Sequence, residues 1–309
     1  MGFLAASVPS SMLPALRSAA PPLAAVARST PLTASLAAGM DLIAATASVA
    51  TSAPVSAAIA AFTAVPAPAR NAGCSVLLLV ASIAWIKICN LLSSAGITSQ
   101  YVSRKLVHMG SGPLFVLCWP LFTPGLGGQL AAMTVPILSV VRLLRAGKAA
   151  EGSEAGAELV RAISRSGDKQ EALEGPMVYT IVLLAATAFG WRSAVSVIAI
   201  NQMAIGDGMA DIVGRRFGKR RFPTFLEPTG KKSVEGSVAF AFFAFVACML
   251  MVGLFNLTGV VALTAAQAAP QLLLISVVAA LVELLPLGDD NFTVPLSSAI
   301  LATVLQGGL

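Results

Sequence analysis

The chain contains few of the residues from which many soluble enzymes build their active sites. His108 is the only histidine among 309 residues, which excludes a metal site made of several histidines. The four cysteines stand in apolar runs without CxxC spacing, so we expect small buried hydrophobes rather than disulfides or zinc ligands. Only 11% of the residues are charged and 57% are hydrophobic, whereas about a quarter of a typical soluble domain is charged. This composition is typical of an integral membrane protein.

The chain also lacks a separate basic domain, although its formal net charge is +6. Nucleic-acid binding would favour a basic region with aromatic residues among the charges, and aromatic residues make up only 6% of the chain. We therefore expect no nucleic-acid partner. Basic loops on one side of a membrane explain the excess of Lys and Arg better.

The first seventy residues differ in composition from the rest. Residues 1–70 are rich in Ala, Ser, Thr and Pro, and they hold three arginines but a single acidic residue. Such acid-poor leaders are typical of organelle transit peptides, and we favour a plastid over a mitochondrial one. The alternative is a disordered tail that stays on the protein. Residues 71–309 are then predicted to form one membrane domain.

Apolar windows of near-spanning length recur from about residue 72 onward. They predict an all-α, multispan integral membrane bundle with about six to eight transmembrane helices. The expected spans lie near 72–92, 107–123, 127–145, 176–191, 193–206, 237–256, 271–287 and 294–307.

Basic residues gather in alternate connections between these spans. If all eight segments cross the membrane, the connections at 92–106, 146–175, 207–236 and 288–293 share one side, and the opposite connections hold only Arg192. This asymmetry predicts that the basic side is the cytosol-equivalent one, which is the stroma in a plastid. It also brings the candidate catalytic segments to one face of the membrane.

The segment Gly206–Ser237 is a charged, glycine-bearing island between two apolar runs. Asp207 and Asp211 are four residues apart and would point the same way on a helix. We expect this pair to hold Mg²⁺, with phosphate oxygens approaching along the small-residue track of Gly214 and Gly218. The simpler alternative for Asp211 is an ion pair with the residue four positions later.

Gly230, Lys231, Lys232 and Ser233 form a short sequence that resembles part of a phosphate-binding loop. A Walker A motif needs glycine five positions before Gly230, but Phe225 stands there, so a Walker fold is excluded. Glycine backbone and lysine side chains still suit a nucleotide phosphate, and we expect these four residues to bind it. The alternative is a basic patch on anionic lipid.

Two further groups of polar residues are candidates. Arg104, Lys105 and His108 share one helical face, where the two cations would keep His108 neutral and able to donate a hydrogen bond to phosphate or alcohol. A structural hydrogen bond is an equally good explanation for His108. Asp289 and Asp290 follow Glu283, and we expect one of these acids, with Asp289 as the candidate, to complete the metal site. Capping of the last helix is the alternative.

Taken in order, five motifs resemble the polyprenol kinase family, and within it the plastid phytol kinase and farnesol kinase branch. The resemblance covers about residues 72–307 and is carried by RKLVHMGSG at 104–112, EGPMVY at 174–179, GDGMADIVGRRFGK at 206–219, GKKSVEGS at 230–237 and VELLPLGDDNFTVPL at 282–296.

The resemblance implies a membrane enzyme that phosphorylates an isoprenoid alcohol with CTP and a divalent cation such as Mg²⁺. Phytol is the first expectation, giving phytyl phosphate for tocopherol synthesis, with farnesol or geranylgeraniol as alternatives. It assigns nucleotide and metal binding to Asp207, Asp211, Lys231 and Lys232, in a chloroplast membrane. Either Asp207 or His108 would take the hydroxyl proton. Membrane lipid is the other expected partner, and no particular protein partner is predicted.

Two other functions fit the sequence less well. A CDP-alcohol phosphotransferase needs the pattern DGxxARx₈GxxxDxxxD, and the residues after Asp207 do not follow it. A transporter for an anionic solute would show internal pseudo-symmetry and polar residues at mid-membrane. The chain shows no such symmetry, and Glu283 is the only clear mid-membrane candidate.

Overall fold

The computed structural model describes residues 53–148 and 169–305. Within these ranges every regular element is helical, and one isolated β-bridge joins Arg221 to Ser233. The all-α prediction is therefore confirmed. The chain divides into two compact units, residues 1–63 and 64–309. Most of the predicted leader lies outside the described residues; helix α4 (Ala53–Ala64) and the first turn of the next helix, which begins at Ala67, are described there.

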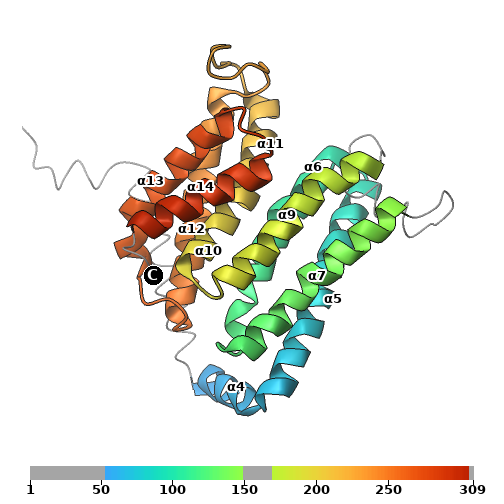
Figure 1. Ribbon diagram of the computed structural model, residues 1–309, viewed down its shortest axis with the longest axis vertical. Coiled ribbons are helices and arrows are strands. Elements are labelled where there is room, and N and C mark those ends of the chain that lie inside the picture. The colour runs from blue at the N-terminus through green and yellow to red at the C-terminus, as the bar shows by residue number, and fades with distance from the viewer. Residues whose placement is uncertain (1–52, 149–168, 306–309) are drawn as a thin grey trace, which may run out of the picture. The chain divides into compact units, whose positions relative to one another are not determined.

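The second unit contains two sets of helices, which Figure 1 shows in blue-green to yellow-green and in yellow to red. In the first set, α5 packs on α6 and α7, and α7 packs on α9. Its elements are α5 (Ala67–Ser94), α6 (Gln100–Leu117), the 3₁₀ turn η1 (Trp119–Leu121), α7 (Leu126–Lys148) and α9 (Lys169–Phe189).

In the second set, α12 packs between α11 and α13, and α14 packs on α10 and α13. Its elements are α10 (Ala194–Asn201), the π-helical turn η2 (Gln202–Gly206), α11 (Asp207–Phe217), α12 (Val234–Leu257), α13 (Ala265–Leu284) and α14 (Asp290–Leu305). Contacts of α6 with η2 and α11, and of α9 with α14, join the two sets.

Side-chain caps explain where several of these helices begin. The hydroxyl groups of Ser99, Ser193 and Ser233 accept hydrogen bonds from backbone N–H groups in the first turns of α6, α10 and α12. Thr264 and Gln267 form a reciprocal capping box at the start of α13. Each cap satisfies a donor that the helix itself leaves open, which fixes the first residue of the helix.

Four of the described helices are long and apolar enough to cross a membrane: α5, residues 126–145 of α7, α12 and α13. The apolar part of α9, Gly175–Phe189, is shorter. The other expected spans correspond to shorter or more polar helices, so the total of six to eight stays a prediction. The multispan helical class is confirmed by these four helices.

The chain does not become a loop after the apolar run that ends near residue 206. It continues through the π-helical turn directly into α11, so Asp207 stands at the first position of a helix. Gln202, at the start of this turn, is fully buried and donates a hydrogen bond of 2.7 Å to Ser276 Oγ on α13. Single π-turns inside helices are often found at functional sites, and this one leads into the charged residues considered next.

Candidate active site

The first group of charged residues lies where α6 meets α11. Lys105 Nζ is 3.3 Å from Asp207 Oδ2 and 3.0 Å from Asp211 Oδ2. Arg215 Nε also lies 2.7 Å from Asp211 Oδ1, so the ion pair considered as the simpler alternative is present. Burial would raise the pKa of the Asp211 carboxyl, but Lys105 and Arg215 outweigh it and lower the pKa to about 2. Asp211 is therefore ionised at neutral pH.

His108 contacts the same carboxylate one turn further along α6. Its Nε2 lies 3.4 Å from Asp207 Oδ2 and 3.3 Å from the carbonyl oxygen of Met203. Both of these atoms accept hydrogen bonds, so Nε2 carries a hydrogen and donates it. Tyr179 packs on the imidazole with ring centroids 4.7 Å apart and donates a 2.9 Å hydrogen bond to the His108 carbonyl. His108 is thus oriented towards Asp207 by its neighbours.

Glycines in this region allow helices to approach closely. A Cβ atom on Gly208 would lie 2.1 Å from Met109 Cγ, so only glycine admits this contact between α11 and α6. A Cβ on Gly236 would lie 2.9 Å from the carbonyl oxygen of Ala210, and Gly214 faces the same part of α12. The small-residue stripe of α11 is therefore filled by α12. The expected approach of phosphate along Gly214 was wrong, because that face is already packed.

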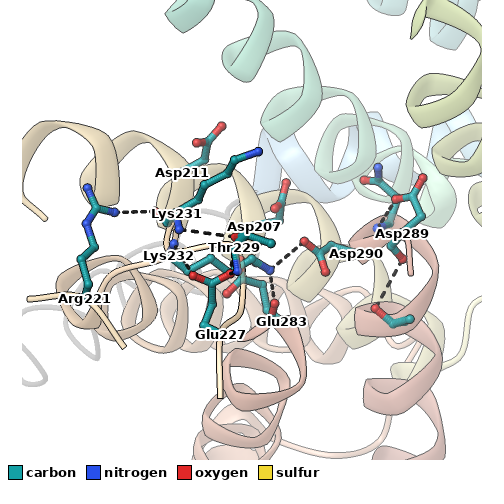
Figure 2. A network of polar contacts seen from close by, with 12 residues as sticks. Asp207, Asp211, Arg221, Glu227, Thr229, Lys231, Lys232, Glu283, Asp289 and Asp290 are labelled. Carbon is teal, nitrogen blue, oxygen red and sulfur yellow. Dashed lines mark hydrogen bonds and ion pairs between the residues drawn. The ribbon is translucent and has the colours of Figure 1, made fainter. Parts of the chain in front are cut away.

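The second group of charged residues surrounds Lys232 (Figure 2). Its Nζ lies 2.9 Å from Glu283 Oε1 and 3.0 Å from Asp290 Oδ2, and it also donates to the Glu283 carbonyl. Burial would lower the pKa of Lys232, but these two carboxylates raise it, so the amine is charged. Asp289 has a different role, because its Oδ1 accepts a 2.8 Å hydrogen bond from Asn291 N in the first turn of α14.

Three carboxylates meet between the two groups. Oxygen atoms of Asp207, Glu283 and Asp290 all lie within 4.8 Å of one another, although the residues belong to α11, α13 and α14. A set of carboxylate oxygens suits a hard divalent cation such as Mg²⁺. Of the predicted metal ligands, Asp207 belongs to this set. Asp211 instead pairs with Lys105 and Arg215, and Asp289 caps α14.

A buried carboxylate that sequence reasoning missed organises the loop before α12. Glu227 is 2% exposed, and its Oε1 accepts a 3.0 Å hydrogen bond from Thr229 N and another from Thr229 Oγ1. Its Oε2 accepts a 3.2 Å bond from Lys232 N. Glu227 thereby sets the backbone from which Lys232 reaches its partners. The available signal was an acid directly before the turn sequence Pro-Thr-Gly, which favours a local side-chain-to-backbone bond.

The predicted phosphate-binding residues take different positions in this loop. Gly230 has a φ of +63°, in the left-handed region that glycine adopts without strain. The side chain of Lys231 is exposed, and its carbonyl accepts a hydrogen bond from Arg221. Ser233 is buried and accepts a 3.2 Å hydrogen bond from Gly236 N as the cap of α12. The loop therefore presents one exposed lysine and one lysine held among carboxylates.

A cavity of about 610 Å³ opens beside these groups. Its wall comes from α5, α6, α7, α9, the start of α11 and residues 288–291. Arg104, Lys105, His108, Asp207 and Asp290 line the charged end. The remainder is lined by apolar side chains, among them Phe115, Val135 and Leu183, together with five hydroxyl-bearing side chains and Arg142, Asp289 and Asn291. The size is within the range of about 300–1,000 Å³ that is usual for small-molecule sites.

The sequence was compared with family models, solved structures and curated proteins. No family model and no solved structure matches the chain. It is 36% identical over 242 residues to a probable chloroplastic phytol kinase of Triticum aestivum, covering 77% of this chain and 78% of that protein.

Two relatives from Arabidopsis thaliana are similar as well. The chain is 37% identical over 218 residues to a chloroplastic farnesol kinase, covering 69% of this chain and 68% of that protein. It is 33% identical over 242 residues to the chloroplastic phytol kinase 1, covering 77% of each protein. The chain belongs to the polyprenol kinase family, in the branch of the plant phytol and farnesol kinases.

Proposed function

We propose that the protein is a membrane kinase that transfers a phosphoryl group from a nucleoside triphosphate to an isoprenoid alcohol. One observation carries this proposal: Lys105, Asp207 and Asp290 line one end of a cavity, in contact with Glu283 and Lys232 behind them, and the cavity extends from there to the apolar side chains of Phe115, Val135 and Leu183. The charged end suits a nucleotide phosphate, and the apolar part suits a hydrocarbon tail. The relatives named as phytol and farnesol kinases support the same assignment.

In the proposed reaction the alcohol oxygen forms a bond to the terminal phosphorus of the nucleotide. The bond from that phosphorus to the bridging oxygen breaks, and the nucleoside diphosphate leaves with the bonding electrons. The hydroxyl proton passes to a base. Asp207 is our candidate, because Nε2 of His108 already carries a hydrogen and donates it to acceptors.

A divalent cation fits the carboxylates at this end of the cavity. Asp207, Glu283 and Asp290 would hold it, because their oxygens lie close enough to share one ion. When bound, Mg²⁺ would neutralise charge on the phosphate oxygens. Lys231, Arg104 and Lys105 stand at or near the same end and are proposed to bind the nucleotide phosphates. Gly230 and Ser233 would act by shaping the loop that carries Lys231.

We propose CTP as the phosphoryl donor and phytol as the first acceptor, with farnesol or geranylgeraniol as further acceptors. The CTP assignment follows from the family resemblance and from the lack of a Walker A motif. The chloroplastic names of the relatives and the apolar helices support a plastid membrane as the location. Phytyl phosphate made there would supply tocopherol synthesis.

An assay with the purified full chain in detergent micelles tests this function. With phytol, Mg²⁺ and CTP labelled at the terminal phosphate, we expect labelled phytyl phosphate, and ATP should give less product. An Asp207→Asn variant serves as the matched control for a contaminating kinase. Absence of product with every isoprenoid alcohol and every nucleoside triphosphate would refute the proposal. Uptake of an anion into proteoliposomes would then favour the transporter.

A further inference from the structure

The cavity extends from the charged end into the core along one face of α6. Lys105, His108, Ser111 and Phe115 line it at helical spacing. From Lys105 to Phe115 the helix rises about 15 Å. The hydrogen bond from Tyr179 to the His108 carbonyl sets α9 beside this face. The charged groups and the far wall of the cavity are thus about three helical turns apart.

The hydroxyl groups along the wall do not offer their hydrogens to a ligand. Each of four side chains from four helices donates to the carbonyl oxygen four residues earlier in its own helix, at 2.6–2.9 Å; these are Ser82, Ser111, Ser139 and Thr180. The hydroxyl of Tyr179 is likewise donated to a backbone carbonyl. A hydroxyl satisfied in this way has no hydrogen left to donate to a ligand. The wall therefore favours a hydrocarbon over a polar solute.

Core side chains line the far part of the cavity. Phe115, Val135 and Leu183 are 3%, 6% and 7% exposed and belong to one hydrophobic cluster with Trp119. The ring of Phe115 packs edge-on against Trp119, with centroids 5.8 Å apart. A longer occupant would have to displace these packed side chains, which close-packed interiors resist.

We propose that this cavity holds the isoprenoid tail of the acceptor alcohol, with its hydroxyl at Asp207 and its last isoprene unit against Phe115, so that Phe115, Val135 and Leu183 limit the tail length. The inference rests on the kinase function proposed above and adds the residues that select the acceptor. In this arrangement, the depth of the cavity determines which lengths of isoprenoid tail can bind.

Two variants with opposite effects on cavity depth test the inference. Ser139 lies between Val135 and Arg142 on the lining face of α7, so Ser139→Phe shortens the cavity without removing a core side chain. Phe115→Leu removes the ring at the far end and lengthens it. The matched control is Leu138→Phe, on the neighbouring residue of α7 that is 44% exposed and does not line the cavity.

The measurement is the ratio of kcat/KM for geranylgeraniol to that for farnesol, which has one isoprene unit fewer. We expect Ser139→Phe to lower this ratio about tenfold or more, because each misplaced methylene in an apolar pocket changes kcat/KM by about 10-fold or more. Phe115→Leu should increase the relative use of an alcohol with five isoprene units. Leu138→Phe should leave the ratio unchanged, and the KM for the nucleotide should stay the same in all three variants.

The outcomes separate this inference from the function on which it rests. If the wild type phosphorylates both alcohols but Ser139→Phe keeps its ratio within twofold, the tail binds elsewhere and the inference is overturned while the kinase function stands. If Phe115→Leu fails to fold, Ser139→Phe alone decides. If the wild type phosphorylates no alcohol, the function and the inference fall together.

Discussion

The two ends of the cavity are built from different kinds of contact. At and behind the charged end, side chains from distant parts of the chain bind one another: Lys105 binds Asp207, and Lys232 binds Glu283 and Asp290. Towards the apolar end, the wall consists of side chains that also belong to the core. In the proposed function, the chemistry is assigned to a few rare charged residues and the choice of acceptor to ordinary hydrophobic ones. A change at one end should affect catalysis, and a change at the other should affect selection.

The largest effect is expected from Asp207→Asn. The variant loses the carboxylate that both Lys105 and His108 contact, and with it the proposed base and one metal ligand. We expect kcat to fall about 10²- to 10³-fold or more, with the ratio between alcohols unchanged. Steady-state kinetics with two alcohols provide the measurement.

Asp211→Asn is the matched control for this variant, because it makes the same change one turn along α11. Asp211 lies beside Lys105 and Arg215 but outside the group of three carboxylates, so we expect a smaller loss of kcat. Wild-type turnover in Asp207→Asn would show that the charged end does not perform the chemistry.

Lys232→Met should reduce both activity and stability. It leaves Glu283 and Asp290 close together without their shared cation, and breaking such a partly buried pair costs up to about 3 kcal/mol. The additional change Glu283→Gln should restore part of the lost stability, but not the activity, because it removes one of the unpaired charges. Thermal unfolding in detergent would measure this. A double variant less stable than Lys232→Met would contradict the ion-pair account.

Lys231→Ala should affect nucleotide binding more than stability. The Lys231 side chain is exposed and has no ion-pair partner in the part of the chain that the structure describes. Loss of one charge-assisted contact is worth about 1.5 kcal/mol or more, so we expect the KM for CTP to rise about tenfold with every alcohol. Lys219→Ala, at an exposed basic residue earlier in the same connection, is the control. Selective loss of one alcohol would place Lys231 at the acceptor instead.

The smallest effect is expected from Glu227→Gln. The amide oxygen still accepts one hydrogen bond from the loop backbone, so the KM for CTP should rise only a few-fold. Glu227→Ala removes all the acceptors and should raise it further, while the KM for the alcohol stays constant in both variants. Hydrogen exchange of the 226–233 backbone should be faster in Glu227→Ala. Unchanged exchange there would show that Glu227 does not hold the loop.

The fold and the charged residues of the candidate site were largely accessible from the sequence, because apolar periodicity and isolated charges are local signals. Asp207, His108, Lys231 and Lys232 were identifiable since charges beside apolar runs are costly and few. Their partners were not identifiable. Lys105 and Asp207 are 102 residues apart, and only helix packing brings them together. The π-helical turn that leads into Asp207 likewise has no local sequence signal.

The two acids at the start of α14 show why a local sequence pattern can leave two roles open for a residue. Asp289 and Asp290 are adjacent, and either can cap a helix or bind a cation. In the structure, Asp289 caps the first turn of α14, and the carboxylate of Asp290 pairs with Lys232 instead. The cavity wall was not predictable at all. The sequence around Phe115 is the same whether this side chain only packs in the core or also limits the length of a bound ligand.

Photo-crosslinking of the acceptor tests most directly whether the two ends divide binding from chemistry. A geranylgeraniol analogue with a diazirine on its last isoprene unit would be bound to the wild type and to Asp207→Asn, and the labelled peptides identified by mass spectrometry. We expect labelling near Phe115 on α6 and Leu183 on α9, to equal extents in both proteins. Labelling on α12 or α13 instead, or its loss in Asp207→Asn, would contradict this account.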